Sequence, residues 1–223
     1  MKSIIIVVEG LTEKEFVDNC LAPYLRQSYN RQDWQIAARV LGKPGKKGGR
    51  VAFSRVKTDV VLLLKERADT VVSMLVDFYG MQIDFPNYED CLQLNQTSSR
   101  IECLEQGMNR AINSRRFKAY FQQYEFEALL FATGNPLNAY LKQATCQAIA
   151  DVRRMVSTPE DINTSSPPSY RLSELFQNNE GISYKKTFHG PILALELGIE
   201  NMLGECPRFA EWVRSLVELA QSP

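Results

Sequence analysis

The sequence has a single histidine, His189, and its five cysteines are scattered without a C-x-x-C pair. One imidazole excludes histidine-rich metal sites and mechanisms that use several histidines, and we expect His189 to be a structural residue at a helix start. An odd number of dispersed cysteines predicts neither a zinc motif nor a disulfide framework. We expect each to be a small buried hydrophobic residue in a reducing compartment. The cysteines are Cys20, Cys91, Cys103, Cys146 and Cys206.

The chain also lacks a long apolar run and a net charge. No segment approaches the length of a membrane span, and the apolar run at the N-terminus is too short for the hydrophobic region of a signal peptide. Lys+Arg and Asp+Glu balance at 26 each, which excludes only a wholly basic nucleic-acid-binding protein, because a local basic patch is compatible with zero net charge. We expect a cytoplasmic protein without a membrane partner.

Apolar segments alternate with helical patterns in the first part of the 223-residue chain. The β-branched run 3–8 has the composition of a strand buried on both faces. Strands separated by helices imply right-handed crossovers, so we predict an α/β fold, Rossmann-like, with a mainly parallel sheet of about four strands and flanking helices. The predicted strands are 3–8, 34–41, 70–77 and 117–123, and the predicted helices include 51–67 and about 98–113.

Beyond the fourth predicted strand the pattern is helical, interrupted by a loop at 157–172 that is rich in serine, proline and asparagine. We predict an α/β core over 1–132 and a helical C-terminal portion over 133–223, packed on the core as one compact unit. Phe209 and Trp212 fall at helical spacing with later apolar residues, which indicates a helix face directed at the core.

Acidic residues follow three of the predicted strands. Glu9 ends the first, Asp77 ends the third, and Glu125 and Glu127 follow the fourth. In a parallel sheet, ligands bind at the carboxyl ends of the strands, where these side chains repel one another. A hard divalent cation, Mg²⁺ or Mn²⁺, takes carboxylate oxygen and water as ligands and removes the repulsion. The pattern therefore predicts a metal site.

Each of these acids has an alternative interpretation. A single strand-end carboxylate is more often a turn or cap residue, so the metal hypothesis depends on the coincidence at three strand ends. Glu125 and Glu127 face different directions if they lie within a helix, and both reach the site if they lie in the turn before it.

The turn after the first strand has a pattern of its own. Gly10 allows a sharp turn, and Thr12 with Glu15 predicts a capping box at the start of the next helix. That arrangement leaves Glu13 free to face the strand-end site.

The segment GKPGKKGGR (42–50) contains four glycines and a proline, and we expect no regular element there. Its basic residues, Lys43, Lys46, Lys47 and Arg50, predict a flexible loop that binds the phosphates of DNA or RNA without reading their sequence. The segment is not a P-loop, because it lacks G-K-[ST]. A solvated surface loop is the alternative interpretation.

The stretch VVEGLTE resembles the first motif of the Toprim fold, the catalytic domain of topoisomerases, primases and nucleases of the overcoming-lysogenization-defect (OLD) type. Over nearly its full length the chain resembles more closely a bacterial family known as domain of unknown function 4276, which is regarded as Toprim-like. The segments that carry this resemblance are VVEGLTEKEFV, LAPYL, GKKGGRVAFSRVKTDV, MLVDFYGMQIDFPNY, YEFEALLF, STPEDIN, PPSYRL, YKK and CPRFAEWVRSL.

The resemblance implies roles for individual residues. Glu9 corresponds to the Toprim glutamate that binds metal or acts as a general acid or base. Glu13 is placed like the second acid of the OLD-type pattern, and Asp77 corresponds to the first aspartate of the D-x-D motif. Lys186 matches the lysine of the family's YKK and is expected to balance phosphate charge.

The chain departs from the family pattern at several tyrosines. Tyr79 stands in place of the second aspartate of D-x-D, so Asp84 or the acids of YEFE would have to compensate. Tyr124 stands where relatives commonly carry histidine, and Tyr170 where they commonly carry lysine.

The resemblance, together with the acidic pattern, implies metal-assisted phosphodiester hydrolysis, with one or two Mg²⁺ or Mn²⁺ ions held by Glu9, Asp77 and Glu127, aided by Glu125. The resemblance to OLD-type systems implies a nuclease that acts in bacterial defence on DNA or RNA. One alternative is a non-catalytic or partner-activated Toprim-like module that works with a separately encoded ABC-type ATPase. A nucleotide-binding regulator that uses the strand-end cleft is a further alternative.

Overall fold

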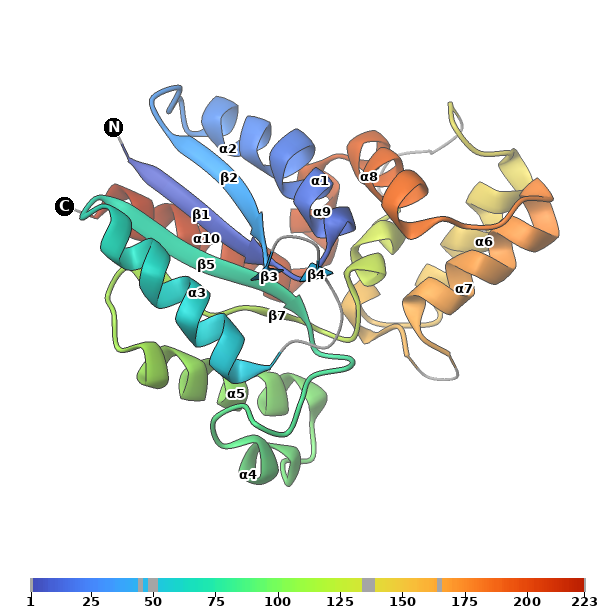
Figure 1. Cartoon of the computed structure of the whole chain (residues 1–223). Coiled ribbons are helices and arrows are strands. Elements are labelled where there is room, and N and C mark those ends of the chain that lie inside the picture. Colours follow the sequence, from blue (N-terminus) through green and yellow to red (C-terminus); the bar gives the residue numbers. More distant parts are fainter. Residues whose placement is uncertain (1, 44–45, 48–51, 134–138, 164–165, 223) are drawn as a thin grey trace.

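The structure, a computed structural model, describes residues 2–43, 46–47, 52–133, 139–163 and 166–222. A parallel sheet forms its centre (Figure 1), with the strands β2 (Gln35–Val40), β1 (Ser3–Val8) and β5 (Thr70–Asp77) side by side in that order. The fourth position is shared by β6 (Phe117–Lys118) and β7 (Phe121–Gln122), which both pair with β5. Every pairing in this sheet is parallel, which confirms the predicted α/β fold.

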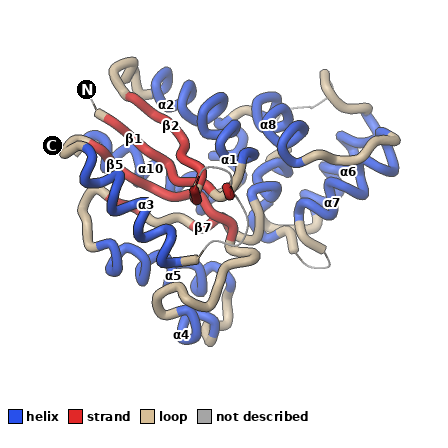
Figure 2. The backbone as a smooth tube through the Cα atoms, in the orientation of Figure 1, coloured by secondary structure: helices blue, strands red, loops and turns tan. Residues whose placement is uncertain are grey.

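Helices cover both faces of the sheet, as Figure 2 shows. Side chains of β1 and β5 alternate between two hydrophobic clusters, so Ile6 and Leu75 pack on one face while Val7 and Met74 pack on the other. Burial on both faces explains why these strands read as uninterrupted apolar runs. The first face carries α1 (Leu11–Phe16), a π-helical turn (Val17–Leu21), α2 (Ala22–Ser28) and α10 (Pro207–Gln221), and the second carries α3 (Phe53–Glu66), α4 (Tyr88–Leu92) and α5 (Thr97–Ile112).

The fourth strand is interrupted, whereas the sequence predicted one strand over 117–123. The Lys118 carbonyl accepts a hydrogen bond from Ser73 Oγ at 2.7 Å, and Ser73 Oγ accepts one from Trp212 Nε1 at 2.8 Å. The outer amides of Ala119 and Phe121 donate to side chains of α5 at 2.8 and 3.0 Å. Side-chain hydrogen bonds therefore replace part of the backbone hydrogen bonding at this edge of the sheet.

The chain after β7 begins with a 3-10 helix (Phe126–Phe131), where a helix start was predicted. Figure 1 places α6 (Gln143–Arg154) and α7 (Pro168–Leu175) beyond the carboxyl ends of the strands, and α8 (Lys186–Leu197) beside α1. A 3-10 turn (Pro159–Asp161), a π-helical turn (Phe176–Glu180) and α9 (Ile199–Glu205) complete this part.

Helix α10 runs back along the sheet, so the two termini lie at the same end of the molecule, where Lys2 Nζ donates to the Ser222 carbonyl at 2.8 Å. Phe209 and Trp212 are buried in the same cluster as the β1 side chains, which confirms the predicted core-facing stripe. The division at residue 132 stays a prediction. No helix in the described ranges is both long and apolar enough to cross a membrane.

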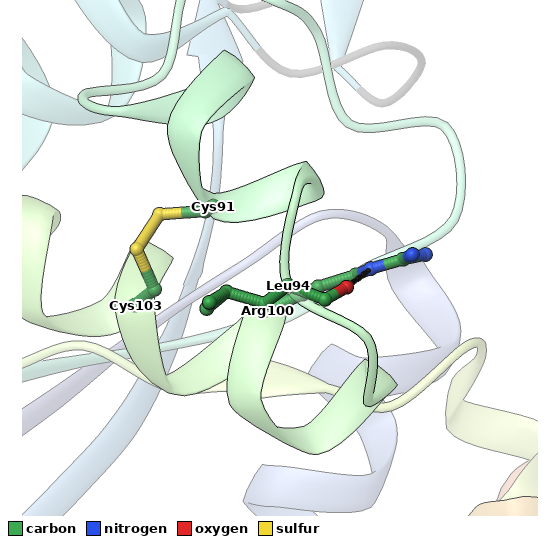
Figure 3. Close-up of a disulfide and its surroundings, with 4 residues drawn as sticks. All are labelled: Cys91, Leu94, Arg100 and Cys103. Atoms are coloured by element: carbon green, nitrogen blue, oxygen red, sulfur yellow. Dashed lines mark hydrogen bonds between the residues drawn. A yellow bond between two sulfur atoms is a disulfide. The ribbon is translucent and has the colours of Figure 1, made fainter.

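A disulfide contradicts the prediction that all five cysteines are free. Cys91 in α4 is bonded to Cys103 in α5, as Figure 3 shows, and beside it Arg100 Nε donates to the Leu94 carbonyl at 2.6 Å. The turn between the helices brings the two Cα atoms to 5.5 Å, which their separation of 12 residues does not reveal. Disulfides persist mainly in oxidising compartments, so this bond weighs against the reducing compartment that the scattered cysteines indicated. The cytoplasmic location stays a prediction.

The prediction of no regular element over 42–50 was also wrong. Gly42–Lys43 (β3) and Lys46–Lys47 (β4) pair as a two-residue antiparallel ladder. Gly42 has φ +107, a conformation that glycine adopts without a steric penalty, and it starts this hairpin. A glycine-rich composition argues against long elements but permits a ladder this short.

Candidate functional site

Glu9 and Asp77 lie at the ends of neighbouring strands. Because β1 and β5 pair in parallel with Val8 opposite Leu75, Glu9 leaves the sheet beside the last residues of β5. Asp77 Oδ1 accepts a hydrogen bond from the Phe126 backbone N at 2.8 Å. That bond ties the end of β5 to the 3-10 helix that carries Glu127, so the three predicted strand ends meet at one edge of the sheet.

The turn between β1 and α1 is capped differently from the prediction. Gly10 is the N-cap, and its backbone N donates to Glu13 Oε2 at 2.9 Å. The predicted pairing of Thr12 with Glu15 was wrong, because the helix begins at Leu11, and Glu15 instead accepts a hydrogen bond from the next turn of the helix. Glu13 therefore has a capping role, and it is not free in the sense that the sequence indicated.

Glu13 nevertheless belongs to the strand-end site. Burial raises the pKa of Glu9 to about 7, with repulsion from Glu13 as the next cause. Burial also raises the pKa of Glu13. The pKa of Asp77 is raised well above its ordinary value by burial and then by the charges of Glu13, Glu127 and Glu9. The structure thus brings these four carboxyl groups together, and with Glu125 we call them the acidic cluster.

Glu125 and Glu127 both face the same lysine. Lys186 Nζ lies 3.3 Å from Glu127 Oε2 and 3.5 Å from Glu125 Oε1. Glu125 is the N-cap of the 3-10 helix and accepts hydrogen bonds from the backbone N and Oγ of Ser169, at 2.9 and 3.0 Å. Glu125 precedes the 3-10 helix and Glu127 lies in its first turn, and in this arrangement two acids only two residues apart reach one lysine.

Glu127 is the most deeply buried member of the pair, with 1% of its surface exposed. Burial raises its pKa to about 7, although the attraction of Lys186 acts in the opposite direction. Among the described residues, its second oxygen, Oε1, has no hydrogen-bond partner. Native proteins rarely leave a buried acceptor unpaired, so this atom indicates a position that a ligand fills.

Lys186 lies in the first turn of α8, and 47% of its side-chain surface is exposed. Burial on its own lowers the pKa of an ammonium group, but attraction to Glu127, Glu125 and Asp77 outweighs that effect and raises the pKa of Lys186. The lysine is therefore a permanent cation within a cluster that holds more carboxyl groups than it can neutralise.

The donor chemistry of the cluster fits a hard divalent cation. All its ligands are carboxylate oxygens, which Mg²⁺ and Mn²⁺ prefer, and Glu127 Oε1 is an acceptor in need of a positive partner. The arrangement is not a preformed cage, because no group of three or more histidine, cysteine or acidic side chains within the described ranges is placed to hold a metal ion. Carboxylates that now face Lys186 would have to turn toward the metal.

The three residues expected to compensate for Tyr79 behave differently. Asp84 Oδ2 accepts a hydrogen bond from the Phe53 backbone N at 2.9 Å, so it caps α3, whereas Glu125 and Glu127 both lie beside Lys186 in the acidic cluster. Tyr79 itself packs against Tyr124, with ring centroids 5.3 Å apart. Tyr124 has φ +65, a left-handed conformation that turns the chain between β7 and the 3-10 helix.

The predicted phosphate-binding loop stays a prediction. The backbones of Lys43, Lys46 and Lys47 form the small hairpin, which Figure 1 places near the carboxyl end of β1. Their side chains and the whole of Arg50 lie outside the described residues.

The sequence interpretation missed two residues at this site. Ser169, at the start of α7, holds Glu125 in place through two hydrogen bonds. The hydroxyl of Tyr184 is buried near Glu127 and finds no hydrogen-bond partner in the part of the chain that the structure describes. Tyr184 belongs to the YKK segment, in which the family resemblance implies a role only for the lysine.

Comparisons with known proteins place the chain in a family and leave its activity open. A search of curated proteins and one of solved structures gave no match. A family model described as "Domain of unknown function (DUF4276)" matches residues 8–217, which include every member of the acidic cluster. With nearly its whole length matched, the chain belongs to the DUF4276 family.

Proposed function

We propose that this protein is a divalent-metal-dependent enzyme of Toprim type that cleaves phosphodiester bonds. The observation that carries the proposal is the surplus of buried and partly buried carboxyl groups over Lys186 at the carboxyl ends of β1 and β5. Carboxylates remain ionised together in such a place only if additional positive charge arrives with a ligand. The order of the parts, a strand ending in Glu9, a Gly10 turn and an adjacent strand ending in Asp77, supports the Toprim comparison.

Glu9, Asp77 and Glu127 are the residues proposed to hold Mg²⁺ or Mn²⁺. When bound, such an ion supplies an activated water and stabilises the charge that develops on the leaving oxygen. Glu125, held in place by hydrogen bonds from Ser169, adds a further negative charge to the site. DNA or RNA is the proposed substrate, and the lysines of the β3–β4 hairpin are its proposed phosphate contacts.

The chain's own groups supply proton transfer and charge balance. Glu9 has a pKa of about 7 in the metal-free protein, and it is proposed either to hold the ion or to transfer a proton as a general acid or base. Glu13 accepts a hydrogen bond from the Gly10 backbone amide, and this bond holds the turn that positions Glu9 at the site. If Glu127 held the metal ion, Lys186 would no longer be paired with it and would be available to a phosphate oxygen.

A second function is favoured by the same lysine. Because Lys186 already pairs with Glu127 and Glu125, and no ready group of ligands is present in the described residues, the site has the features of a switched-off state. In this proposal the chain is a partner-activated module, and a separately encoded ABC-type ATPase moves α8 and frees the carboxylates. For either proposed function, a role in antiviral defence is supported only by the resemblance to OLD-type systems.

The test is a cleavage assay with Mn²⁺ on single- and double-stranded DNA and RNA. The native chain is compared with Glu9→Gln and with Glu15→Gln, a control on the same turn of chain whose side chain bonds Asn19 outside the cluster. The proposal expects cleavage that Glu9→Gln abolishes and Glu15→Gln retains. Activity that appears only when the neighbouring ATPase is added supports the second function, and no cleavage under either condition contradicts both.

A further inference from the structure

Tyr184 has a buried hydroxyl whose position is set by packing. Its ring stacks on His189 with centroids 5.7 Å apart and meets Phe176 edge-on at 5.2 Å. His189 is itself fixed, because its Nδ1 accepts a hydrogen bond from the Lys185 backbone N at 2.7 Å. The hydroxyl is thus aimed by two aromatic neighbours, although no hydrogen bond to another described residue holds it.

The hydroxyl lies close to residues that adjoin the acidic cluster in the chain. A Cβ at Gly190 would lie 3.3 Å from the hydroxyl oxygen, 3.0 Å from Thr12 Cγ2 and 3.8 Å from Phe126 Cε1, so the hydroxyl is near the residue before Glu13 and the residue between Glu125 and Glu127. Gly190 also allows α8 to approach α1 and leaves room for this atom. Figure 1 shows the two helices side by side.

Two unpaired polar atoms therefore lie in this region, on different segments of the chain. The Tyr184 hydroxyl is a donor, and Glu127 Oε1 is an acceptor, and both are buried without partners among the residues that the structure describes. A tyrosine hydroxyl is protonated at neutral pH, so this group keeps its donor hydrogen. A ligand that satisfies both atoms brings a cation or a hydrogen-bond donor for Glu127 and an oxygen acceptor for Tyr184.

A phosphate with its counter-cation has this composition. We propose that the Tyr184 hydroxyl donates a hydrogen bond to a non-bridging oxygen of a phosphate group bound at the acidic cluster, beside Lys186. This inference rests on the proposed function, since it assigns the phosphate contact of the same site. The competing arrangement is internal: after a small rotation Tyr184 donates to Glu127 instead, and its role is then structural.

The experiment measures binding of inorganic phosphate in the presence of Mg²⁺ by isothermal titration calorimetry, together with the thermal unfolding midpoint of each protein. Tyr184→Phe removes the hydroxyl alone. Tyr170→Phe is the control, because Tyr170 is on α7 with 54% of its surface exposed. We expect Tyr184→Phe to weaken phosphate binding roughly tenfold, as for loss of a hydrogen bond to a charged group, with an unchanged midpoint, and Tyr170→Phe to change neither.

Two results overturn the inference. Absence of phosphate binding by the native protein is one. The second is an equal phosphate affinity of the native protein and Tyr184→Phe. If the variant then also has a lower unfolding midpoint, the Tyr184 hydroxyl forms the internal hydrogen bond to Glu127. The outcome is separable from that of the cleavage assay. Phosphate binding that depends on Tyr184, without cleavage, supports the phosphate contact and contradicts the nuclease proposal. Cleavage together with phosphate binding that does not depend on Tyr184 supports the nuclease proposal and contradicts the phosphate contact.

Discussion

Lys186 Nζ lies 3.3 Å from Glu127 Oε2, and this contact joins two segments that are 59 residues apart in the chain. It places a permanent cation where the proposed metal must bind. The carboxylates of the cluster are partly neutralised when no metal is bound, and the remainder of their mutual repulsion is relieved by protonation. Stability, metal binding and pH are therefore linked at this site.

The native protein without divalent metal should lose stability as pH rises from 6 to 8. Burial raises the pKa of both Glu9 and Glu127 to about 7, so each binds its proton more tightly in the folded state. Such a group stabilises the fold fully below its unfolded pKa, and the contribution is lost as pH rises through the folded value. We expect the unfolding midpoint to fall by on the order of 5 °C over this window. A midpoint that stays constant or rises contradicts the raised pKa values of Glu9 and Glu127.

Mg²⁺ or Mn²⁺ should raise the unfolding midpoint at pH 8, because a ligand that binds only the folded state stabilises it by mass action. Asp77→Asn should abolish this response, since the substitution removes a charge from the centre of the cluster. Asp69→Asn is the matched control: Asp69 precedes the same strand at its other end, where it pairs with Arg67 on the surface. An equal metal response in native protein and Asp77→Asn excludes the proposed ligands.

Gly190→Ala should destabilise the fold by about 1–3 kcal/mol, because its Cβ would crowd Thr12 Cγ2 at 3.0 Å. Gly204→Ala is the control, since a Cβ at Gly204 in α9 meets nothing within 4 Å. That change should be neutral or stabilising by up to about 1 kcal/mol, as expected for replacing glycine in a helix. Chemical denaturation of both variants measures the difference, and equal stabilities show that α8 does not need this close approach.

Ser73→Ala should cost about 1–3 kcal/mol of unfolding free energy, because it leaves the buried Trp212 indole N–H without its acceptor and the Lys118 carbonyl without its donor. Thr58→Ala, which removes an exposed hydroxyl from α3, is the comparison. Urea unfolding monitored by tryptophan fluorescence reports both. A loss no larger than that of Thr58→Ala indicates that water replaces the Ser73 contacts.

Much of the sheet was predictable because its strands are buried on both faces. The run 70–77 coincides with β5, and 3–8 coincides with β1, since a buried parallel strand leaves an unbroken apolar signal. The fourth strand was predicted less well, because its ladder is broken by Ser73, a residue 45 positions away from Lys118. No pattern local to 117–123 carries that information.

The sequence by itself determined which acids end the strands, since Glu9 and Asp77 follow apolar runs whose length and composition dictate where each strand stops. It also determined that a glycine follows Glu9 and that Phe209 and Trp212 face a core. Only the tertiary structure decided which of these groups meet. The pairing of Lys186 with Glu127 and the buried hydroxyl of Tyr184 both depend on how α8 packs against α1 and the 3-10 helix. Such contacts join residues far apart in the chain, and their geometry comes from close packing of side chains rather than from any periodicity.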